Sequence, residues 1–167
     1  MLRFHNVYGP KGTRESGKEK VPAAVCRKVG EAQDGSSMVV WGDGRRTPSF
    51  TCMWTTAVED IHRLMQSDHG EPLNLGTDRL VTIGELVNII TEAAGKEIEK
   101  DHDLSKPQGV RGRNSDNSRL REVLGWEPEV SLEEGIAETY DWIWEQLDEQ
   151  ERAVEPGPDA EPAVASR

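Results

Sequence analysis

Short apolar segments that read as strands alternate with amphipathic helices along most of the chain. RFHNVYGP (3–10) reads as the end of a buried strand that runs into a Gly-Pro loop, and PLNLG (72–76) reads as a second short strand ended by glycine. TIGELVNIITEAAG (82–95) has helical spacing; its first and fourth residues suit a capping box and its final glycine a helix end. The alternation predicts an α/β fold, although the strand content is low for an independent parallel sheet.

Helical spacing and end signals predict further helices at 19–30, 57–67, 115–126 and 131–147. The helix at 57–67 is expected to bury one apolar face, which consists of Val58, Ile61, Leu64 and Met65. MVVWGDGRRTPSFT (38–51) reads as a strand, a Gly-Asp-Gly turn and a second strand, which predicts a β-hairpin.

The ends of the last two helices are marked by particular residues. The helix at 115–126 is expected to begin at Ser115 or Asp116 and to end at Gly125, and the last helix is expected to begin at Ser131. Residues 151–167 are rich in Pro, Ala and Glu and show no apolar periodicity. They predict a disordered acidic tail that follows a domain at 1–150.

Composition restricts the class of protein and of partner. The 167 residues carry a net charge of −11, with 31 acidic against 20 basic side chains, and this argues against a nucleic-acid partner, which needs a positive surface. No segment is apolar enough to span a membrane and the first residues lack the apolar core of a signal peptide, so we expect a cytoplasmic protein without a membrane partner. Cys26 and Cys52 are expected to be reduced thiols, and no histidines have metal-ligand spacing, so no metal site is expected. The acidity fits either a solvated surface or adaptation to high salt.

Basic clusters interrupt this acidic chain at residues 11–28, 42–47 and 109–117. Arginine forks suit phosphate oxygens, and a neighbouring glycine lets the backbone approach a ligand closely. Each cluster alone also fits a solvated surface. Together they predict a binding site for an anionic, phosphate-bearing ligand.

These segments also carry a resemblance to a known family. RFHNVYGP, EKVPAAVCRK, WGDG and EPLNLGTD are similar, in this order, to the C-terminal half of the extended short-chain dehydrogenases/reductases, the NAD-dependent epimerase/dehydratase family of nucleotide-sugar enzymes. Within it, EKVPAAVCRK and GVRGRNSDN most resemble the GDP-mannose 3,5-epimerases. The resemblance implies a substrate-binding lobe over residues 1–150, without the N-terminal Rossmann core. It also implies epimerisation of a nucleotide sugar through transient oxidation of the sugar by NAD, a cofactor bound mainly by the half outside this chain.

The resemblance assigns Lys20 as the catalytic acid/base, whereas the residues alone favour a surface lysine at a helix start. The substrate-binding residues that it implies are Asn6, Glu19, Lys20, Val21, Lys28, Arg46, Thr47 and Arg113. Asn6 would contact the sugar, and Lys28 with Arg113 the diphosphate. Arg46 and Thr47 would lie at the nucleotide end. Pro48 stands where those epimerases have an arginine, which weakens an assignment to GDP-mannose.

Some family features are absent from the sequence. It has no Gly-rich turn of the kind that seats the NAD pyrophosphate, and neither Tyr8 nor Tyr140 is followed by lysine at the family's Tyr-x-x-x-Lys spacing. Residues 52–56 depart from the family pattern, through a shifted reading frame or ordinary divergence. We therefore expect a truncated chain that is inactive alone, whose partner is a second copy or a separately encoded N-terminal half. Another sugar-nucleotide 4-epimerase or dehydratase and a non-catalytic binding lobe remain open alternatives.

Overall fold

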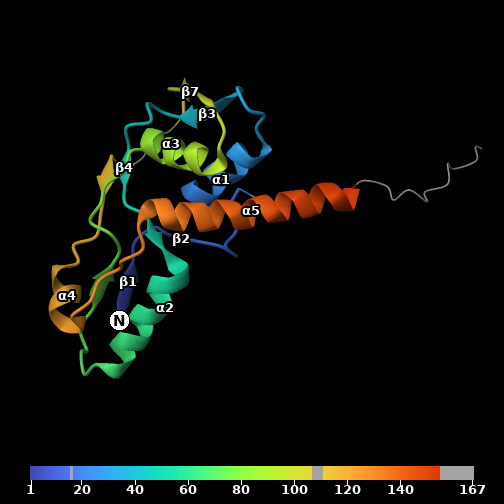
Figure 1. The fold of residues 1–167 in the computed structure, drawn as a ribbon. Helices are drawn as coiled ribbons and strands as arrows, with labels where there is room; N and C mark the ends of the chain where they lie inside the picture. The colour runs from blue at the N-terminus through green and yellow to red at the C-terminus, as the bar shows by residue number, and fades with distance from the viewer. Residues whose placement is uncertain (16, 107–110, 155–167) are drawn as a thin grey trace, which may run out of the picture.

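The computed structural model describes residues 1–15, 17–106 and 111–154, and at 53–56 and 154 only the backbone. Its helices and strands form an upper and a lower lobe in the view of Figure 1. The upper lobe contains α1 (Val21–Glu31), α3 (Ile83–Ala94), α5 (Leu132–Val154), β3 (Ser37–Trp41) and β7 (Glu99–Asp103). The lower lobe contains β1 (Leu2–Phe4), β6 (Leu73–Leu75), α2 (Met53–Gln66) and α4 (Ser118–Leu124). Between the lobes lie β2 (Val7–Tyr8) with β5 (Thr51–Cys52), and β4 (Thr47–Pro48) with β8 (Gly112–Arg113).

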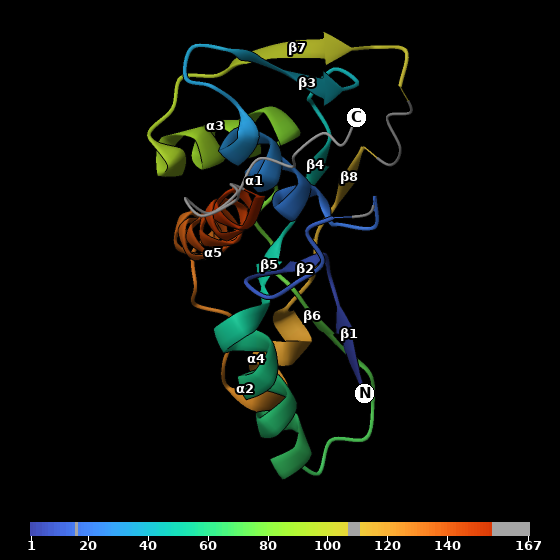
Figure 2. The same cartoon turned by 90° about the vertical axis from the view of Figure 1, so that its right-hand side faces the viewer.

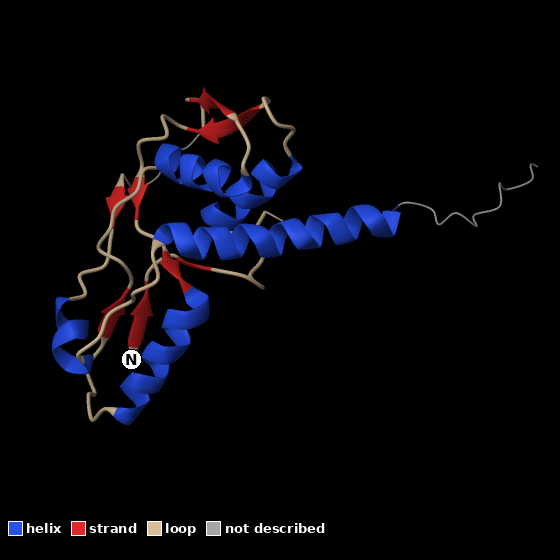
Figure 3. Cartoon of the chain, in the orientation of Figure 1, coloured by secondary structure: helices blue, strands red, loops and turns tan. Residues whose placement is uncertain are grey.

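The strands that the structure describes pair two by two, and each pair is parallel. Figure 2 shows these pairs following one another down the molecule, and Figure 3 shows helices beside them in both lobes, so the predicted α/β class is confirmed. Within the described ranges no helix combines the length and apolarity that crossing a membrane requires.

The predicted hairpin at 38–51 is wrong. β3 pairs with β7, so that Val39 lies opposite Asp101, and β4 pairs with β8. The glycines between β3 and β4 do form a tight turn, since Gly42 and Gly44 both have positive φ. That turn separates the two strands instead of joining them, because each strand takes its partner from a segment much later in the chain.

The ends of α3 agree with the prediction. The Thr82 hydroxyl accepts the Glu85 amide at 3.0 Å, the Glu85 carboxylate accepts the Thr82 amide at 2.8 Å, and Gly95 follows in the left-handed conformation. The start of helix α4 differs from the prediction. Its N-cap is Asn117, and neither Ser115 nor Asp116 takes that position. The predicted Asp116 nevertheless accepts the Ser118 amide at 3.0 Å.

Helix α5 begins where the sequence predicts and runs further than predicted. The Ser131 hydroxyl accepts the Glu134 amide at 3.2 Å, which caps the first turn. The helix then continues to Val154, past the predicted boundary at residue 150. The rest of the predicted tail, 155–167, lies outside the described residues.

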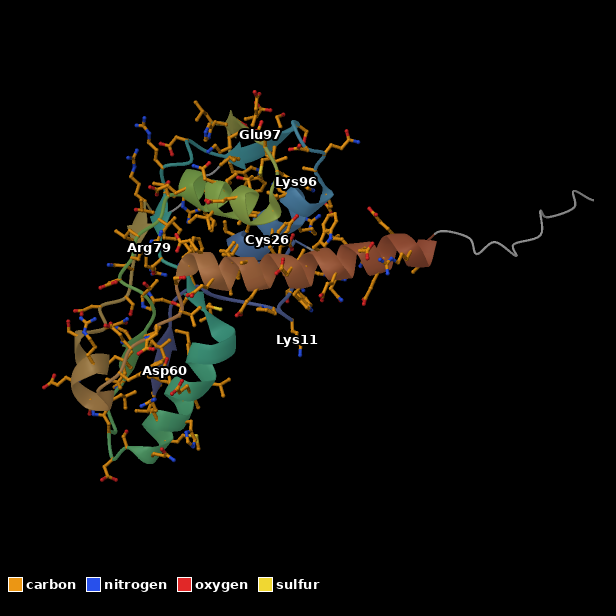
Figure 4. The ribbon with its side chains drawn as sticks, viewed as in Figure 1. Lys11, Cys26, Asp60, Arg79, Lys96 and Glu97 are labelled. Atoms are coloured by element: carbon orange, nitrogen blue, oxygen red, sulfur yellow. The ribbon has the colours of Figure 1, made fainter. Side chains whose placement is uncertain are left out.

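The main core lies in the upper lobe, where α1, α3 and α5 pack together beneath β3. Cys26 and Val29 of α1 and Ile143 of α5 are completely buried in it, and Figure 4 shows Cys26 where α1 meets α5. Gly30 lets these helices approach closely, because a Cβ there would lie 2.8 Å from Leu147 Cδ1. Cys26 and Cys52 are both buried, and neither forms a disulfide within the described residues.

The predicted apolar face of α2 is wrong in its orientation. Val58 is 66% exposed, Ile61 43% and Met65 80%, so these side chains face outward. Only Leu64 contacts the small core of the lower lobe. Asp60 is instead completely buried. Helical spacing identified the stripe correctly, but nothing local in the sequence decides which side of a helix meets its neighbours.

Candidate functional site

The carboxyl ends of β1 and β6 lie side by side because the two strands are parallel, with Phe4 opposite Leu75. The His5 amide continues this pairing by donating to the Leu75 carbonyl at 2.9 Å. Ligands of parallel α/β sheets bind outside the carboxyl ends of strands. The polar residues that follow these strand ends are therefore candidates for a ligand site.

Asn6 follows β1 and ties it to two other segments. Its side-chain amide donates to the Ser49 carbonyl at 3.0 Å, and the Ser49 amide donates to the Arg113 carbonyl at 2.8 Å. Asn6 has a φ of 40°, in the left-handed region that asparagine tolerates better than most residues. The end of β1, the chain after β4 and the end of β8 are thus held together.

Thr47 lies in β4, the strand that pairs with β8, and Arg46 directly precedes it. Thr47 lies opposite Gly112, and both its amide and its hydroxyl donate to the Arg111 carbonyl, at 2.7 and 3.2 Å. The Arg46 carbonyl accepts the Ile83 amide at 3.0 Å. The structure therefore brings together neighbouring segments that carry Asn6, Arg46, Thr47 and Arg113, four of the predicted substrate-binding residues.

The GRNSDN part of the 109–117 cluster fixes the position of Arg113. The side-chain amide of Asn117 donates to the Gly76 carbonyl at 2.7 Å, and the side-chain amide of Asn114 donates to the Asp78 carbonyl at 3.1 Å. Buried Ser115 donates to Asn117 at 2.7 Å. Since these short polar residues bind the loop after β6, their contribution is positional, and the exposed Arg113 side chain is left available to a ligand. Residues 109–110 of this cluster lie outside the described ranges.

His5 belongs to this group, although the sequence analysis did not select it. Its partial burial lowers its pKa, and the nearby Arg113 cation lowers that pKa further. Its Nδ1 atom is buried without a hydrogen-bond partner among the described residues. The only sequence signal was its place beside Asn6 at the end of a strand.

The remaining predicted residues lie at the two ends of α1. Lys20 is the N-cap residue, its carbonyl accepts the Ala24 amide at 2.9 Å, and its exposed side chain makes no hydrogen bond or ion pair with any residue that the structure describes. Val21, which follows it, is 37% exposed. Lys28 lies half-buried in the last turn.

Arg27 organises the segment that leads into α1. It donates to Glu19 at 3.3 Å, to Glu31 at 3.0 Å and to the Arg14 carbonyl at 3.1 Å. Hydrogen bonds from its own backbone amide and from Arg27 lower the pKa of Glu19, whose side chain is only 8% exposed. Part of the basic cluster at 11–28 is therefore neutralised within the protein and is not available to phosphate.

The two groups of predicted residues remain separate in this structure. The hydrogen bonds of Glu19 and Lys20 stay within 14–31, and in the described ranges none reaches Asn6, Thr47 or Arg113. Their assignment to one substrate site stays a prediction.

The two hollows found among the described residues do not lie at the predicted site residues. One of about 190 Å³ opens between β5 and the start of α5, and one of about 260 Å³ lies beside α3. They share Arg79, which binds Glu133 through two hydrogen bonds of 2.8 and 2.7 Å. None of the eight predicted residues lines either hollow.

The turns after β5 and β6 do not provide a seat for the NAD pyrophosphate. That group needs a Gly-rich turn between a strand and a helix, whereas β5 passes into α2 through Cys52 without a glycine. Gly76, which follows β6, is closed by its neighbours, since a Cβ there would lie 2.6 Å from Ser115 Cβ. In the same ranges, no three histidine, cysteine or acidic side chains gather as a metal site requires.

The comparisons with known proteins all point to related nucleotide-sugar enzymes. The model of the GDP-mannose 4,6 dehydratase family matches residues 1–139. GDP-mannose 3,5-epimerase 1 of Oryza sativa subsp. indica is 46% identical over 148 residues, which cover 89% of this chain and 38% of the relative, and the Arabidopsis thaliana GDP-mannose 3,5-epimerase is 45% identical with the same coverage. Among solved structures, UDP-glucose 4-epimerase of Thermotoga maritima with UDP-glucose superposes with a TM-score of 0.78 at 30% identity, over 87% of this chain and 46% of that one.

The chain therefore spans well under half the length of the curated relatives that it matches. The match extends across both lobes and includes every segment that carried the resemblance in the sequence, so the predicted family is confirmed. This chain belongs to the GDP-mannose 4,6 dehydratase family, a family of nucleotide-sugar epimerases and dehydratases.

Proposed function

We propose that this chain is the substrate-binding part of a nucleotide-sugar epimerase that acts on GDP-mannose. The observation that carries the proposal is the 46% identity with a GDP-mannose 3,5-epimerase over 89% of the chain. The same match supports a nucleotide-sugar substrate more strongly than it supports the particular nucleotide, because Pro48 replaces a cationic donor that the resemblance implies.

The polar residues at the strand ends suit the diphosphate and the sugar. Arg113 is exposed on a backbone held by β4, and a guanidinium suits two phosphate oxygens at once. Lys28 and Arg46 supply further positive charge. One carboxylate oxygen of Glu19, Oε2, is buried without a partner among the described residues, so it can accept a sugar hydroxyl only if the segment around it moves.

Lys20 is the proposed acid/base residue. Inverting a carbon centre requires a proton to leave one face and another to reach the opposite face, so two acid/base groups must flank the sugar. Lys20 is exposed at the N-terminus of α1, where the helix dipole favours negative charge that develops on a bound substrate. Neither cysteine of this chain can be the second group, since both are buried and burial raises the pKa of Cys26 to about 12.

NAD is the proposed cofactor of the whole enzyme and would be held by protein outside this chain. The turns after β5 and β6 do not form its pyrophosphate site. We accordingly propose that the chain is inactive alone and works with a polypeptide that supplies the rest of the fold. The cytoplasm is the proposed compartment, in keeping with the reduced state of Cys26 and Cys52.

The test replaces the matched region of the Arabidopsis GDP-mannose 3,5-epimerase with residues 1–148 of this chain and follows exchange of the sugar C3 and C5 protons in deuterated water. The hybrid should exchange both protons, and Lys20→Met should reduce the exchange rate at least a hundredfold. Lys18→Met, at an exposed lysine in the same segment, is the matched control and should leave it unchanged. Activity that survives Lys20→Met would refute the catalytic assignment.

The same assay separates the alternatives. A 4-epimerase would exchange neither proton, because it moves only a hydride at C4. A 4,6-dehydratase would exchange the C5 proton while the sugar loses water, and would leave the C3 proton in place. A hybrid that binds GDP-mannose but exchanges no proton and forms no product would favour the non-catalytic binding lobe.

A further inference from the structure

Arg27 lies in the middle of α1 and forms hydrogen bonds through every nitrogen of its guanidinium group. Nε donates to the Arg14 carbonyl at 3.1 Å, Nη2 donates to Glu19 at 3.3 Å, and Nη1 donates to both carboxylate oxygens of Glu31 at 3.0 and 3.1 Å. An arginine fork can bind three acceptors in these directions at once, whereas a lysine offers a single charged nitrogen. Because the three acceptors belong to different parts of the chain, Arg27 connects them.

Two features hold the Arg27 side chain in place. Glu31 lies four residues later on the same helix, so this ion pair spans one turn of α1. Cys26, the residue before Arg27, is completely buried where α1 meets α5 (Figure 4). The side chain of Arg27 is itself only 26% exposed. The guanidinium group is therefore fixed relative to the upper core, and its other two contacts fix the chain before α1 relative to that core.

The start of α1 lacks the local signals that usually fix a helix end. Lys20 is the N-cap, but its side chain makes no capping hydrogen bond, and the first turn contains no acidic residue. Serine, threonine, aspartate and asparagine are the usual N-caps, because their short side chains bind the first free amides of a helix. Pro22 suits the first turn but restricts only the backbone there. The position of Lys20 therefore depends on contacts made by the residues before it.

The two residues that Arg27 binds before α1 are themselves largely buried. Glu19 directly precedes Lys20, and its side chain is 8% exposed. The Arg14 side chain is 17% exposed and lies over the Trp142 ring of α5, with the guanidinium carbon 5.7 Å from the ring centroid. A charge-assisted hydrogen bond to a buried carboxylate is stronger than one exposed to water. Arg27 therefore restrains the chain at Arg14 and at Glu19, the residue beside Lys20.

We propose that Arg27 is a positioning residue for the nucleotide-sugar reaction: through Glu19 it fixes where Lys20 meets the substrate. This proposal rests on the proposed function, in which Lys20 is the acid/base group. Proton transfer requires hydrogen-bond reach, so a displacement of Lys20 by about 1 Å is enough to slow the reaction. Arg27 acts through the chain and not through its charge at the substrate, because its donors already bind Arg14, Glu19 and Glu31.

The first test uses the full chain without substrate and follows its cleavage by a glutamate-specific protease. In the wild type the Glu19 side chain is buried, so cleavage after it requires local release of the chain. Arg27→Gln should accelerate this cleavage about tenfold or more. Cleavage after Glu138, in the middle of α5, requires the helix to unfold and should not change. Arg63→Gln is the matched control, because Arg63 also pairs with a glutamate four residues away, and this variant should be cleaved like the wild type.

Glu31→Gln supplies a second variant that leaves the core intact. The Glu31 side chain is 48% exposed, so its replacement loosens Arg27 without opening the contact between helices. It should accelerate cleavage after Glu19 in the same direction and by less, about threefold. Unchanged cleavage after Glu19 in both variants would overturn the proposal. Equal acceleration after Glu138 would also overturn it, since the whole protein would then be less stable.

The second test uses the hybrid enzyme and measures whether Arg27 acts through Lys20. Arg27→Gln should lower kcat for exchange of the sugar protons about tenfold or more, because the acid/base group is displaced. In the Lys20→Met background the same change should leave the residual rate nearly unchanged, because the group that Arg27 positions is gone. A merely structural role would lower both rates alike, so losses of equal size in the two backgrounds would overturn the proposal.

The proposed function and the positioning role fail in different ways. A wild-type hybrid that exchanges no sugar proton would refute the proposed function, and the positioning role with it. An active wild-type hybrid whose Arg27→Gln variant is equally fast would refute the positioning role alone.

Discussion

Replacement of Asp60 by asparagine should stabilise the protein, and more so as the pH rises. Asp60 is completely buried on α2, and neither of its oxygens has a hydrogen-bond partner in the described ranges. Burial raises its pKa from 3.8 to about 7, with a further increase from Glu59 and a partial offset from Arg63. A buried carboxylate without a partner is costly, so the native state favours the protonated form.

The direction of this pH effect on stability follows from how tightly Asp60 binds its proton in the native and unfolded states. Because the native state holds this proton more tightly than the unfolded chain, the contribution of Asp60 to the free energy of unfolding falls as the pH rises from about 4 to about 7. At about 1.4 kcal/mol for each tenfold change in proton affinity, the difference between the two pKa values sets an upper limit of about 4 kcal/mol above pH 7. Asparagine has nearly the same shape and no proton to lose, so this loss should disappear.

Urea unfolding of the wild type and of Asp60→Asn between about pH 5.5 and about pH 8 measures the effect, and the gain from the substitution should grow by about 2 kcal/mol over this range. Asp141→Asn, which neutralises an exposed aspartate on α5, should give a gain that is small and nearly constant. A gain for Asp60→Asn that does not change with pH would refute the assignment of a raised pKa. Destabilisation at every pH would show that the carboxylate has a partner in solution.

Three other outcomes follow from contacts elsewhere. Gly135→Ala should destabilise the protein by about 1–3 kcal/mol in thermal unfolding, because the new Cβ would lie 2.5 Å from the Tyr8 hydroxyl. Gly70→Ala is the control: a Cβ there would have no atom within 4 Å, so the stability of this variant should be within about 0.5 kcal/mol of wild type. Thr82→Ala should cost about 1 kcal/mol in urea unfolding, while Thr82→Ser should recover most of it, since serine keeps the capping hydroxyl. Arg113→Gln should raise the pKa of His5 in an NMR titration, because the substitution removes the cation that lowers this pKa. Pyrophosphate bound to the wild type should also raise the pKa of His5. An unchanged His5 pKa in the variant would contradict the proximity of the two side chains.

The helices could be predicted because their signals are local. The capping box of α3 and the glycine that follows it occupy the predicted positions, since both depend on residues within a single turn. The strand partners could not be predicted in the same way. Val39 lies opposite Asp101, a pairing that no turn sequence encodes, and the Gly-Asp-Gly turn at 42–44 looked like a hairpin because such turns usually join neighbouring strands.

The candidate site likewise contains features that could be predicted and features that depend on contacts between distant segments. The resemblance selected both Asn6 and Arg113, and a hydrogen-bonded path through Ser49 joins their segments, while their roles toward a substrate stay a prediction. It could not show that Glu19 would be engaged by Arg27, because that contact depends on how the preceding loop folds back onto α1. His5 was missed for a related reason, since a histidine at a strand end is informative only once its neighbouring arginine is known.

Helix α2 shows why the remaining error matters for function. Its apolar stripe faces outward while Asp60 faces inward, so local pattern and packing disagree on this helix. Natural sequences usually keep such levels consistent, and conflicts concentrate where another requirement acts. The two sides of α2 are therefore predicted to respond differently to substitution: Asp60→Asn on the buried side should change stability and its pH dependence, and Met65→Glu on the exposed side should leave the pH dependence of stability unchanged, which urea unfolding of both variants measures.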